Sequence, residues 1–390
     1  MENVMPRYVR PVAKIDDPVN KTEFWNEAVD AFDEKKYKQT VIAILNYINP
    51  SLLEGKDTES DIEITKMQGS AELQVKITDS LFSVKAPFLK ITPETHKIPL
   101  LRKVAELNFT PLMLAQIHQK DNELWFEYEM PLDLSYPHKV YDILHNVAVY
   151  SDDFDDMFIE NYKASFYKTP AYKQLTEKEK QEVWKQISDI FEDYKNYTEF
   201  FREKRWDDFI WDIIALSLLK ISNMPYVHGK LRSDLIEEIS RLFNGDIDYN
   251  YRMEKGTAYM NKLVNTPKEE ILKNIYHADT FISLRWRSNP QIITDRLKHY
   301  VEQVEKNRKN EYCFSQAYYL QVAFLKLIYD FNLEENYKQA IYDVLEKVSG
   351  LEPDKAAPEL LEVFYAMHEG RINQQKTKEN KKGFFAQLFK

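Results

Sequence analysis

Apolar residues recur at two different periods along the chain. In 22–49, and again from 169 to 370, they recur every three or four positions, which predicts amphipathic helices. Between about 61 and 130 the period falls to two, and the segments 71–78 and 123–130 alternate apolar and polar residues strictly. This alternation is typical of an antiparallel sheet with one packed face and one face in water.

The order of elements in 22–166 is predicted to be α, three or four β, α, β, β, α, with helices covering one face of the sheet. The fold class is therefore α+β, followed by an all-helical domain. Thr176 with Glu179 predicts a capping box at the start of one later helix, and 267–287 is predicted as another helix. The expected parts are an extended arm at 1–21, an α+β domain at 22–168, a helical domain at 169–370 and a basic tail at 371–390.

Composition excludes several classes of function. Only 8 of 390 residues are glycine and none are clustered, so the chain has no Gly-rich phosphate loop. With Cys313 as its single cysteine, it has neither an intrachain disulfide nor a cysteine metal site. The net charge of −10 disfavours nucleic acid as a partner. The first residues lack the pattern of a signal peptide, so we expect a cytoplasmic protein.

Catalytic motifs are absent from the sequence. It contains no His-Glu-x-x-His, no Gly-x-Ser-x-Gly and no Walker A pattern, so we expect no catalytic residues, no metal site and no cofactor. An enzyme remains an alternative, with a site at the domain junction that uses carboxylates such as Asp207, Asp208 or Asp212.

Two short patterns have both a functional and an ordinary interpretation. His138 and His145 are seven residues apart on one predicted helix, but no third metal ligand is evident, so they are expected at the surface or in local hydrogen bonds. The run 285–287, Arg-Trp-Arg, fits stacking on a base or binding an anion. It equally fits a helix end with a partly buried tryptophan.

Two groups of residues are candidates for binding a partner protein. In the strand 123–130, Trp125 stands among glutamates on the polar face, either as a contact anchor or covered by the arm or the helical domain. The acidic run at 152–156 fits a solvated helix face, and its functional interpretation is contact with a basic partner segment. The predicted partner-binding residues are Trp125, Phe126, Tyr128, Met130, Asp152, Asp153, Asp155 and Asp156.

The tail combines six basic residues and one acidic residue with an aromatic end. This composition fits an anionic membrane interface, a partner's groove, or packing on the same chain. The residues expected to make tail docking or membrane contact are Phe384, Phe385, Leu388, Phe389, Lys381 and Lys382.

Segments 70–75, 98–108, 112–117 and 124–130, with the helix from Pro137, resemble the type III secretion chaperone-like fold of the Tir chaperone and YbjN-type families. The resemblance covers about 145 of the 390 residues, and the helical part is not recognised. It implies a protein without chemistry of its own that holds a non-globular client segment on hydrophobic patches of helix and sheet. Family members are often dimers, so a homodimer is also implied.

The sequence thus predicts a non-enzymatic adaptor or chaperone-like protein that holds an extended partner segment on a sheet face or edge. The alternative is a helical scaffold that binds its partner through 171–370, tethered to a membrane surface by the tail.

Overall fold

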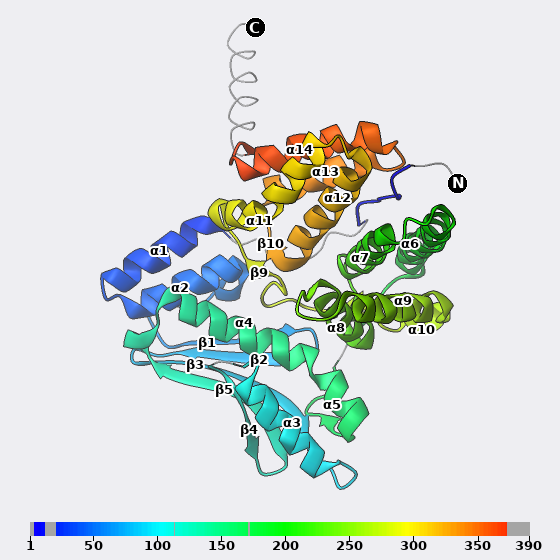
Figure 1. The fold of residues 1–390 in the computed structure, drawn as a ribbon. Helices are drawn as coiled ribbons and strands as arrows, with labels where there is room; N and C mark the ends of the chain where they lie inside the picture. Colours follow the sequence, from blue (N-terminus) through cyan, green and yellow to red (C-terminus); the bar gives the residue numbers. More distant parts are fainter. Residues whose placement is uncertain (1–3, 12–20, 113, 171, 373–390) are drawn as a thin grey trace, which may run out of the picture.

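The computed structural model describes residues 4–11, 21–112, 114–170 and 172–372. Two halves lie side by side, and each half surrounds its own hydrophobic core (Figure 1). The first half combines an antiparallel sheet with helices and the second is almost entirely helical, so the chain is a mixed α+β protein.

The first half follows the predicted order of elements. These elements are α1 (Thr22–Asp33), α2 (Tyr37–Ile48), η1 (Pro50–Leu53), β1 (Ile62–Gln68), β2 (Ala71–Ile77), β3 (Leu81–Lys90), α3 (Lys97–Phe109), β4 (Gln116–Lys120), β5 (Glu123–Pro131), η2 (Leu132–Leu134), α4 (Pro137–Asp153), α5 (Asp155–Tyr162) and β6 (Ser165–Phe166).

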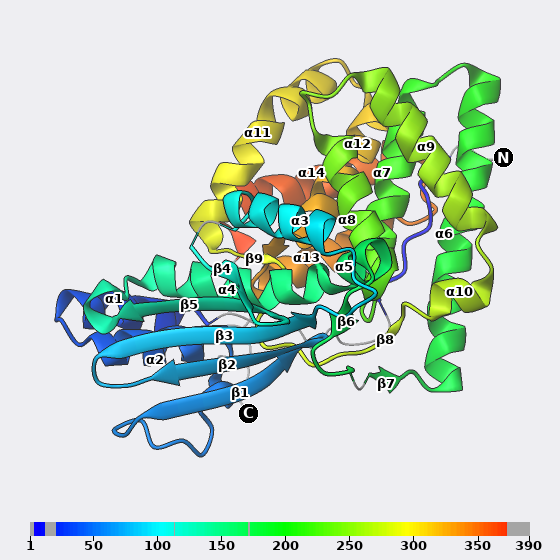
Figure 2. The same ribbon diagram turned by 90° about the horizontal axis from the view of Figure 1, so that it is seen from below.

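The strands form one antiparallel sheet in the order β1-β2-β3-β5-β4, and β6 pairs with the end of β3. Helix α4 lies across β1, β2, β3 and β5, with α2 packed on it, while α3 packs on β4 and α5 (Figures 1 and 2). The other face carries a ladder of charges, in which Lys76 pairs with Glu63 at 2.7 Å and Lys120 with Glu127 at 2.5 Å. The predicted antiparallel sheet with one packed and one polar face is therefore confirmed.

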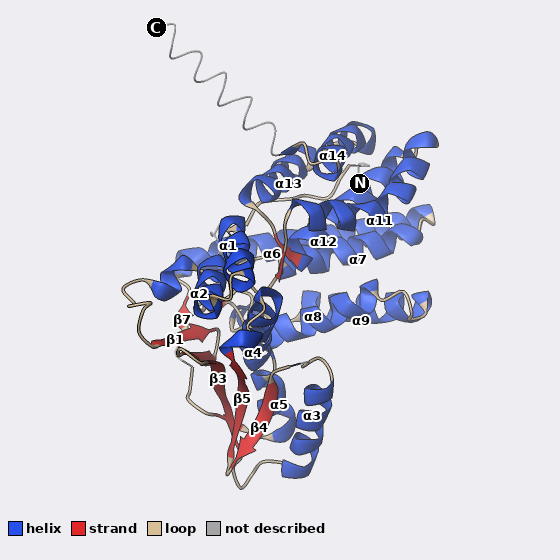
Figure 3. Cartoon of the chain, turned by 90° about the vertical axis from the view of Figure 1, so that its left-hand side faces the viewer, coloured by secondary structure: helices blue, strands red, loops and turns tan. Residues whose placement is uncertain are grey.

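The second half packs its helices in layers away from the sheet (Figure 3). Its elements are β7 (Lys173–Gln174), α6 (Glu177–Lys204), α7 (Asp208–Ser222), α8 (Gly229–Phe243), α9 (Tyr249–Asn265), α10 (Lys268–Leu272), β8 (Tyr276–His277), β9 (Trp286–Arg287), α11 (Pro290–Lys309), α12 (Cys313–Asp330), β10 (Phe331–Asn332), α13 (Glu335–Val348) and α14 (Pro353–His368). The capping box of Thr176 and Glu179 is present at the start of α6.

The described part of the arm, residues 4–11, is extended and packs on the helical half. The Met5 N–H donates to the Leu351 carbonyl at 2.8 Å, and the Met5 carbonyl accepts from the Gly350 N–H at 3.1 Å. The Arg7 guanidinium binds the Asp193 carboxylate at 2.8 Å. This part of the arm therefore does not cover Trp125.

The segment 267–287 is the largest error of the sequence prediction. Only α10 is helical there, and the chain then runs as β8, a loop and β9. The loop places Phe281 and Ile282 in the core of the first half, where both are buried. Burial in the other core outweighs the local helical pattern, because tertiary packing routinely overrides propensity.

Candidate functional site

The predicted partner-binding residues of β5 do not share one surface. Phe126 and Met130 are buried in the core of the first half, so their assignment to a partner-binding surface is wrong. Trp125 is half-buried on the polar face, with its ring 5.3 Å from that of Tyr167. Tyr128 is also half-buried, and the Lys139 ammonium lies 5.7 Å from its ring.

Side chains of the same chain occupy part of both outer edges of the sheet. On β4, the Asn108 amide accepts from the Ile117 N–H at 2.7 Å and donates to the Ile117 carbonyl at 2.9 Å. On β1, the Lys56 ammonium donates to the Glu63 carbonyl at 2.8 Å. An added strand needs such backbone groups free, so these contacts oppose strand addition at both positions.

An exposed apolar face on α3 was missed by the sequence analysis. Ile98 and Phe109 are 69% and 88% exposed, and they stand on one side of the helix with Ala105 and the half-buried Leu101. The opposite side, which includes Leu100 and other apolar residues, packs into the core. A helix that is apolar on two faces is the sequence signal that could have revealed this surface. We call Ile98, Leu101, Ala105 and Phe109 the α3 stripe.

The acidic run lies at the junction between the two halves rather than on a solvated helix face. The Arg232 guanidinium of α8 pairs with Asp153 at 3.0 Å and with Asp152 at 3.5 Å, and all three side chains are largely buried. The Lys230 ammonium, from the same helix, pairs with Glu160 at 3.2 Å. The basic partner of the run is therefore α8 of the same chain, and the expected exposed face for a basic client is wrong.

Ser70 connects two members of the run. Its N–H donates to the Asp152 carboxylate at 2.7 Å, and its hydroxyl lies 3.0 Å from the same carboxylate and also contacts the carboxyl group of Asp155. Burial and the neighbouring Asp152 carboxylate raise the pKa of Asp155 well above its usual range. Burial also raises the pKa of Asp153 to about 6 despite the attraction of Arg232, and it raises the pKa of Asp156. The junction thus holds carboxylates whose protonated form is favoured more than it is in water.

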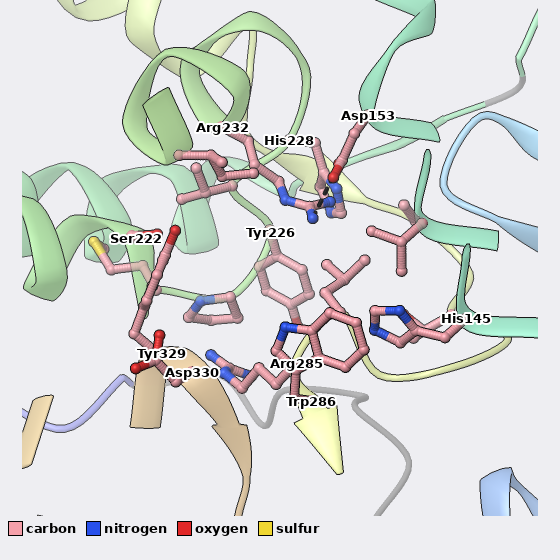
Figure 4. Close-up of a pocket in the computed structure, with 18 of the residues that line it drawn as sticks. His145, Asp153, Ser222, Tyr226, His228, Arg232, Arg285, Trp286, Tyr329 and Asp330 are labelled. Atoms are coloured by element: carbon pink, nitrogen blue, oxygen red, sulfur yellow. Dashed lines mark ion pairs between the residues drawn. The ribbon is translucent and has the colours of Figure 1, made fainter. Parts of the chain in front are cut away.

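A pocket of about 260 Å³ lies beside this ion pair (Figure 4). Four segments form its walls: α4, the α7–α8 connection with α8, the loop that precedes β9, and the end of α12. Its lining includes His145, Asp153, Tyr226, His228, Arg232, Arg285, Trp286, Tyr329 and Asp330. We call it the junction pocket, because α4 belongs to the first half and the other segments to the second.

His145 is the most unusual group in the junction pocket. It is only 3% exposed, and neither ring nitrogen has a hydrogen-bond partner. Its ring stacks on that of Trp286, with centroids 4.5 Å apart and planes 24° apart. Burial, with a contribution from the positive Arg232, lowers the pKa of His145 to about 4, so the imidazole is neutral at neutral pH. The expectation of a surface or locally bonded histidine is wrong for His145.

The Arg-Trp-Arg run divides between two environments. Trp286 is 47% exposed and lines the junction pocket with Arg285. Arg287 points away from it, with its guanidinium 4.2 Å from the Trp25 ring and in contact with His138. Trp286 and Arg287 form the short strand β9, and Arg285 precedes it, so the run is not a helix end.

The carboxylates of the enzyme alternative lie elsewhere. Asp207, Asp208 and Asp212 begin α7, and none of them lines the junction pocket. Burial, with a contribution from Asp208, raises the pKa of Asp212 to about 7. The tail residues Phe384, Phe385, Leu388, Phe389, Lys381 and Lys382 lie outside the described residues.

The part of the chain that the structure describes offers neither a metal centre nor a membrane-spanning helix. Within 4–11, 21–112, 114–170 and 172–372, no group of three or more His, Cys, Asp or Glu side chains is arranged to hold a metal ion. In the same ranges no helix combines the length and the apolar character that crossing a bilayer requires.

Comparison of the chain with protein-family models, with curated proteins and with solved structures finds no match in any of the three.

Proposed function

We propose that this chain is a non-enzymatic, protein-binding adaptor that holds an amphipathic segment of a partner protein on the α3 stripe. The single observation that carries this proposal is the exposure of Phe109 and Ile98, at 88% and 69%, on one side of the same helix. Soluble proteins seldom leave large apolar side chains together in water without a use for them.

The energetics of the stripe suit a binding surface. Burying one Phe or Ile side chain contributes about 1.5–3 kcal/mol. In a typical interface a few anchor residues supply most of the binding free energy. Phe109 and Ile98 would be two such anchors. Leu101 and Ala105 lie between them and complete a face as long as α3 itself. A partner helix packed along α3 would cover all four residues.

The charges beside the stripe specify the partner further. Helix α3 carries Lys97, Arg102 and Lys103 against the single acid Glu106, on a chain whose net charge is −10. Glu106 pairs with Lys103 at 2.6 Å, so the excess positive charge of the helix is that of Lys97 and Arg102. Acidic residues beside the apolar face of a partner would meet this local positive charge and speed the encounter. The proposed partner is therefore an amphipathic helix with acidic flanks, not the basic segment expected from 152–156.

The chaperone-like arrangement is part of the same proposal. The order of α1 and α2, β1 to β3, α3, β4 and β5, and α4 supports a chaperone-like first half followed by a helical half. In such a fold a client held on a helix face is the expected mode of binding. Trp125, half-buried on the polar sheet face, is a secondary contact in this proposal.

Fluorescence anisotropy with two synthetic peptides tests the proposal. Both peptides are 18-residue helices with leucines on one face; one carries glutamates on its other face and the second carries lysines. We expect the full chain to bind the glutamate peptide at least tenfold more tightly than the lysine peptide. Phe109→Ser should weaken that binding at least tenfold, which corresponds to about 1.4 kcal/mol.

The matched control is Tyr312→Ser, which removes an exposed aromatic residue from the helical half. It should change the affinity less than twofold. Equal binding by the natural chain and Phe109→Ser would overturn the proposal. So would light scattering that shows a dimer converted to a monomer by Phe109→Ser, because a second copy would then cover the stripe.

A further inference from the structure

We propose that the helical half contains a binding groove for an extended partner peptide with two arginines three residues apart, and that the chain's own arm occupies this groove as a competitor. The groove lies between α6 and α7 on one side and α13 with the α13–α14 connection on the other, and residues 4–11 run along it (Figure 1). We call it the arm groove. This inference is independent of the α3 stripe, which belongs to the first half.

The walls of the arm groove are supported by other helices. Helix α6 packs on α7, and α13 packs on α14, while α7 and α14 both pack on α12. The shape of the groove therefore does not depend on the arm alone. A preorganised site of this kind loses less free energy when it binds its occupant.

The first reason for the proposal is that side chains of the groove bond to the backbone of the arm. The Arg7 N–H donates to the Asp193 carboxylate at 2.8 Å. The Tyr8 N–H donates to the Ser349 hydroxyl at 2.9 Å. Two arm carbonyls also accept from side chains of α6, that of Val4 from Tyr197 at 2.7 Å and that of Arg10 from Gln186 at 3.2 Å. Any extended peptide offers such main-chain groups, so these contacts suit peptide recognition.

Lys220 is an unusual member of this set. It is only 9% exposed, in an apolar part of α7, and its ammonium donates to the Arg7 carbonyl at 2.6 Å. Burial lowers the pKa of Lys220 to about 8, which shows that its charged form is disfavoured there. Lysine is almost never buried without a partner. A peptide carbonyl in the arm groove supplies that partner.

The second reason is the match of charge along the groove. The guanidinium of Arg7 binds Asp193 of α6 at 2.8 Å. The guanidinium of Arg10 binds Asp343 and Glu346 of α13 at 2.6 and 3.0 Å. Residues three apart on an extended chain point to opposite sides, so two arginines with this spacing meet one acidic wall each.

Two anchors complete the motif. Met5 is fully buried and Tyr8 is 9% exposed, and both belong to the core of the helical half. The partner class is therefore an extended segment that reads apolar residue, any residue, Arg, aromatic residue, any residue, Arg. The order matches residues 5–10 of the chain itself.

A partner with this motif can displace the arm, because it offers the same contacts. The advantage of the arm is its attachment to the chain, which acts like a local concentration on the order of millimolar. The side chains of Arg7 and Arg10 remain 44% and 30% exposed, and ion pairs that are partly in water contribute little each. The arm is therefore held by contacts that a competing peptide can replace one by one.

Fluorescence anisotropy with a labelled peptide of residues 4–11 tests the inference on the full chain. The variant Arg7→Glu/Arg10→Glu places acids against the acidic walls and so removes the chain's own arm from the groove. We expect the peptide to bind this variant with a Kd below about 0.1 mM and the natural chain at least about tenfold more weakly, because the natural arm competes. A peptide with glutamine in place of both arginines should bind the variant at least about tenfold more weakly than the natural peptide.

Lys306→Glu/Lys309→Glu is the matched control. It reverses two exposed charges at the same spacing on α11 and leaves the arm in place, so it should bind the peptide no better than the natural chain. No binding of about 1 mM peptide to the folded variant Arg7→Glu/Arg10→Glu would overturn the inference. So would a dimer of the natural chain that this variant converts to a monomer in light scattering, because the arm of a second copy would then be the occupant.

Hydrogen exchange on the natural chain gives the answer if the double variant does not fold. Addition of about 5 mM peptide should accelerate exchange at the amides of Arg7 and Tyr8, since both lose their acceptors when the arm is displaced. Unchanged exchange at both amides would then refute the inference.

Discussion

The guanidinium of Arg232 lies 3.0 Å from the carboxylate of Asp153, and this contact joins α8 of the helical half to α4 of the sheet half. Asp152 shares the same guanidinium at 3.5 Å. Two buried carboxylates thus depend on one cation that is about 80 residues away in the sequence. The junction is held by a charge network rather than by apolar packing alone.

Removing the cation should destabilise the protein strongly. Arg232→Gln leaves Asp152 and Asp153 buried without a counter-charge, so we expect a loss of about 3–5 kcal/mol in the free energy of unfolding at pH 7. Urea denaturation, monitored by circular dichroism, measures this loss of stability. Arg308→Gln, which breaks the exposed pair with Glu305, should cost at most about 1 kcal/mol. Similar small losses in both variants would contradict the proposed role of the junction pair.

Neutralising Asp155 should have the opposite effect. Burial and the neighbouring Asp152 raise its folded pKa above the ordinary value of 3.8, so the folded state binds a proton more readily than the unfolded state. This contribution to stability is complete below about pH 4 and is lost as the pH rises through the raised pKa. Asp155→Asn imitates the protonated form and should therefore stabilise the chain at pH 7.

The gain from Asp155→Asn should shrink towards zero at pH 4, where the natural residue is itself protonated. Urea titrations at pH 4 and pH 7 provide this comparison. Asp57→Asn is the control: the Ser60 hydroxyl and the Glu59 N–H lower the pKa of Asp57, so its neutralisation should not stabilise the chain at pH 7. A gain at Asp155 that is independent of pH would contradict the explanation by desolvation.

Gln68 should be essential for the position of the loop that precedes β9. Its buried side-chain oxygen accepts from the N–H groups of Phe281 and Ile282 at 2.8 and 3.0 Å. Gln68→Ala leaves both donors unsatisfied, so we expect a loss of about 2–6 kcal/mol, given about 1–3 kcal/mol for each buried group. In this variant, amide hydrogen exchange should accelerate more at Phe281 and Ile282 than at amides in the core of the helical half.

The exposed Gln119 of β4 offers the matched control for Gln68. Gln119→Ala should change stability by no more than about 0.5 kcal/mol. Unchanged exchange at Phe281 and Ile282 in Gln68→Ala would show that burial alone holds the loop.

The sequence predicted elements whose pattern is local. Strands β2 and β5 alternate strictly and α6 begins with the capping box of Thr176 and Glu179, so each element carries its own signal. The segment 267–287 carries no such local signal for its fold, because its conformation depends on residues that are distant in the sequence. Phe281 and Ile282 pack into the other core, and their backbone donors bind Gln68, more than 200 residues earlier.

The candidate sites were predictable only in part. The run 152–156 was recognised as acidic, but its partner Arg232 is distant in sequence, so its burial was not foreseen. His145 does carry a local signal, because the stretch 143–149 of α4 that contains it is mostly apolar and is buried throughout. That signal predicts its burial, whereas its contact with Trp286 depends on the tertiary fold.

The N-terminal arm should contribute to the stability of the helical core. Met5 is fully buried, and its N–H and carbonyl both bond to the α13–α14 connection. Met5→Ala should therefore cost about 2–5 kcal/mol in unfolding free energy, as for other large-to-small changes in a core. Val9→Ala, four residues along and 56% exposed, should cost at most about 0.5 kcal/mol. Thermal and urea unfolding of the two variants measure the difference. Equal stability of both would mean that the arm is detached in solution, since only an attached arm makes the two positions unequal.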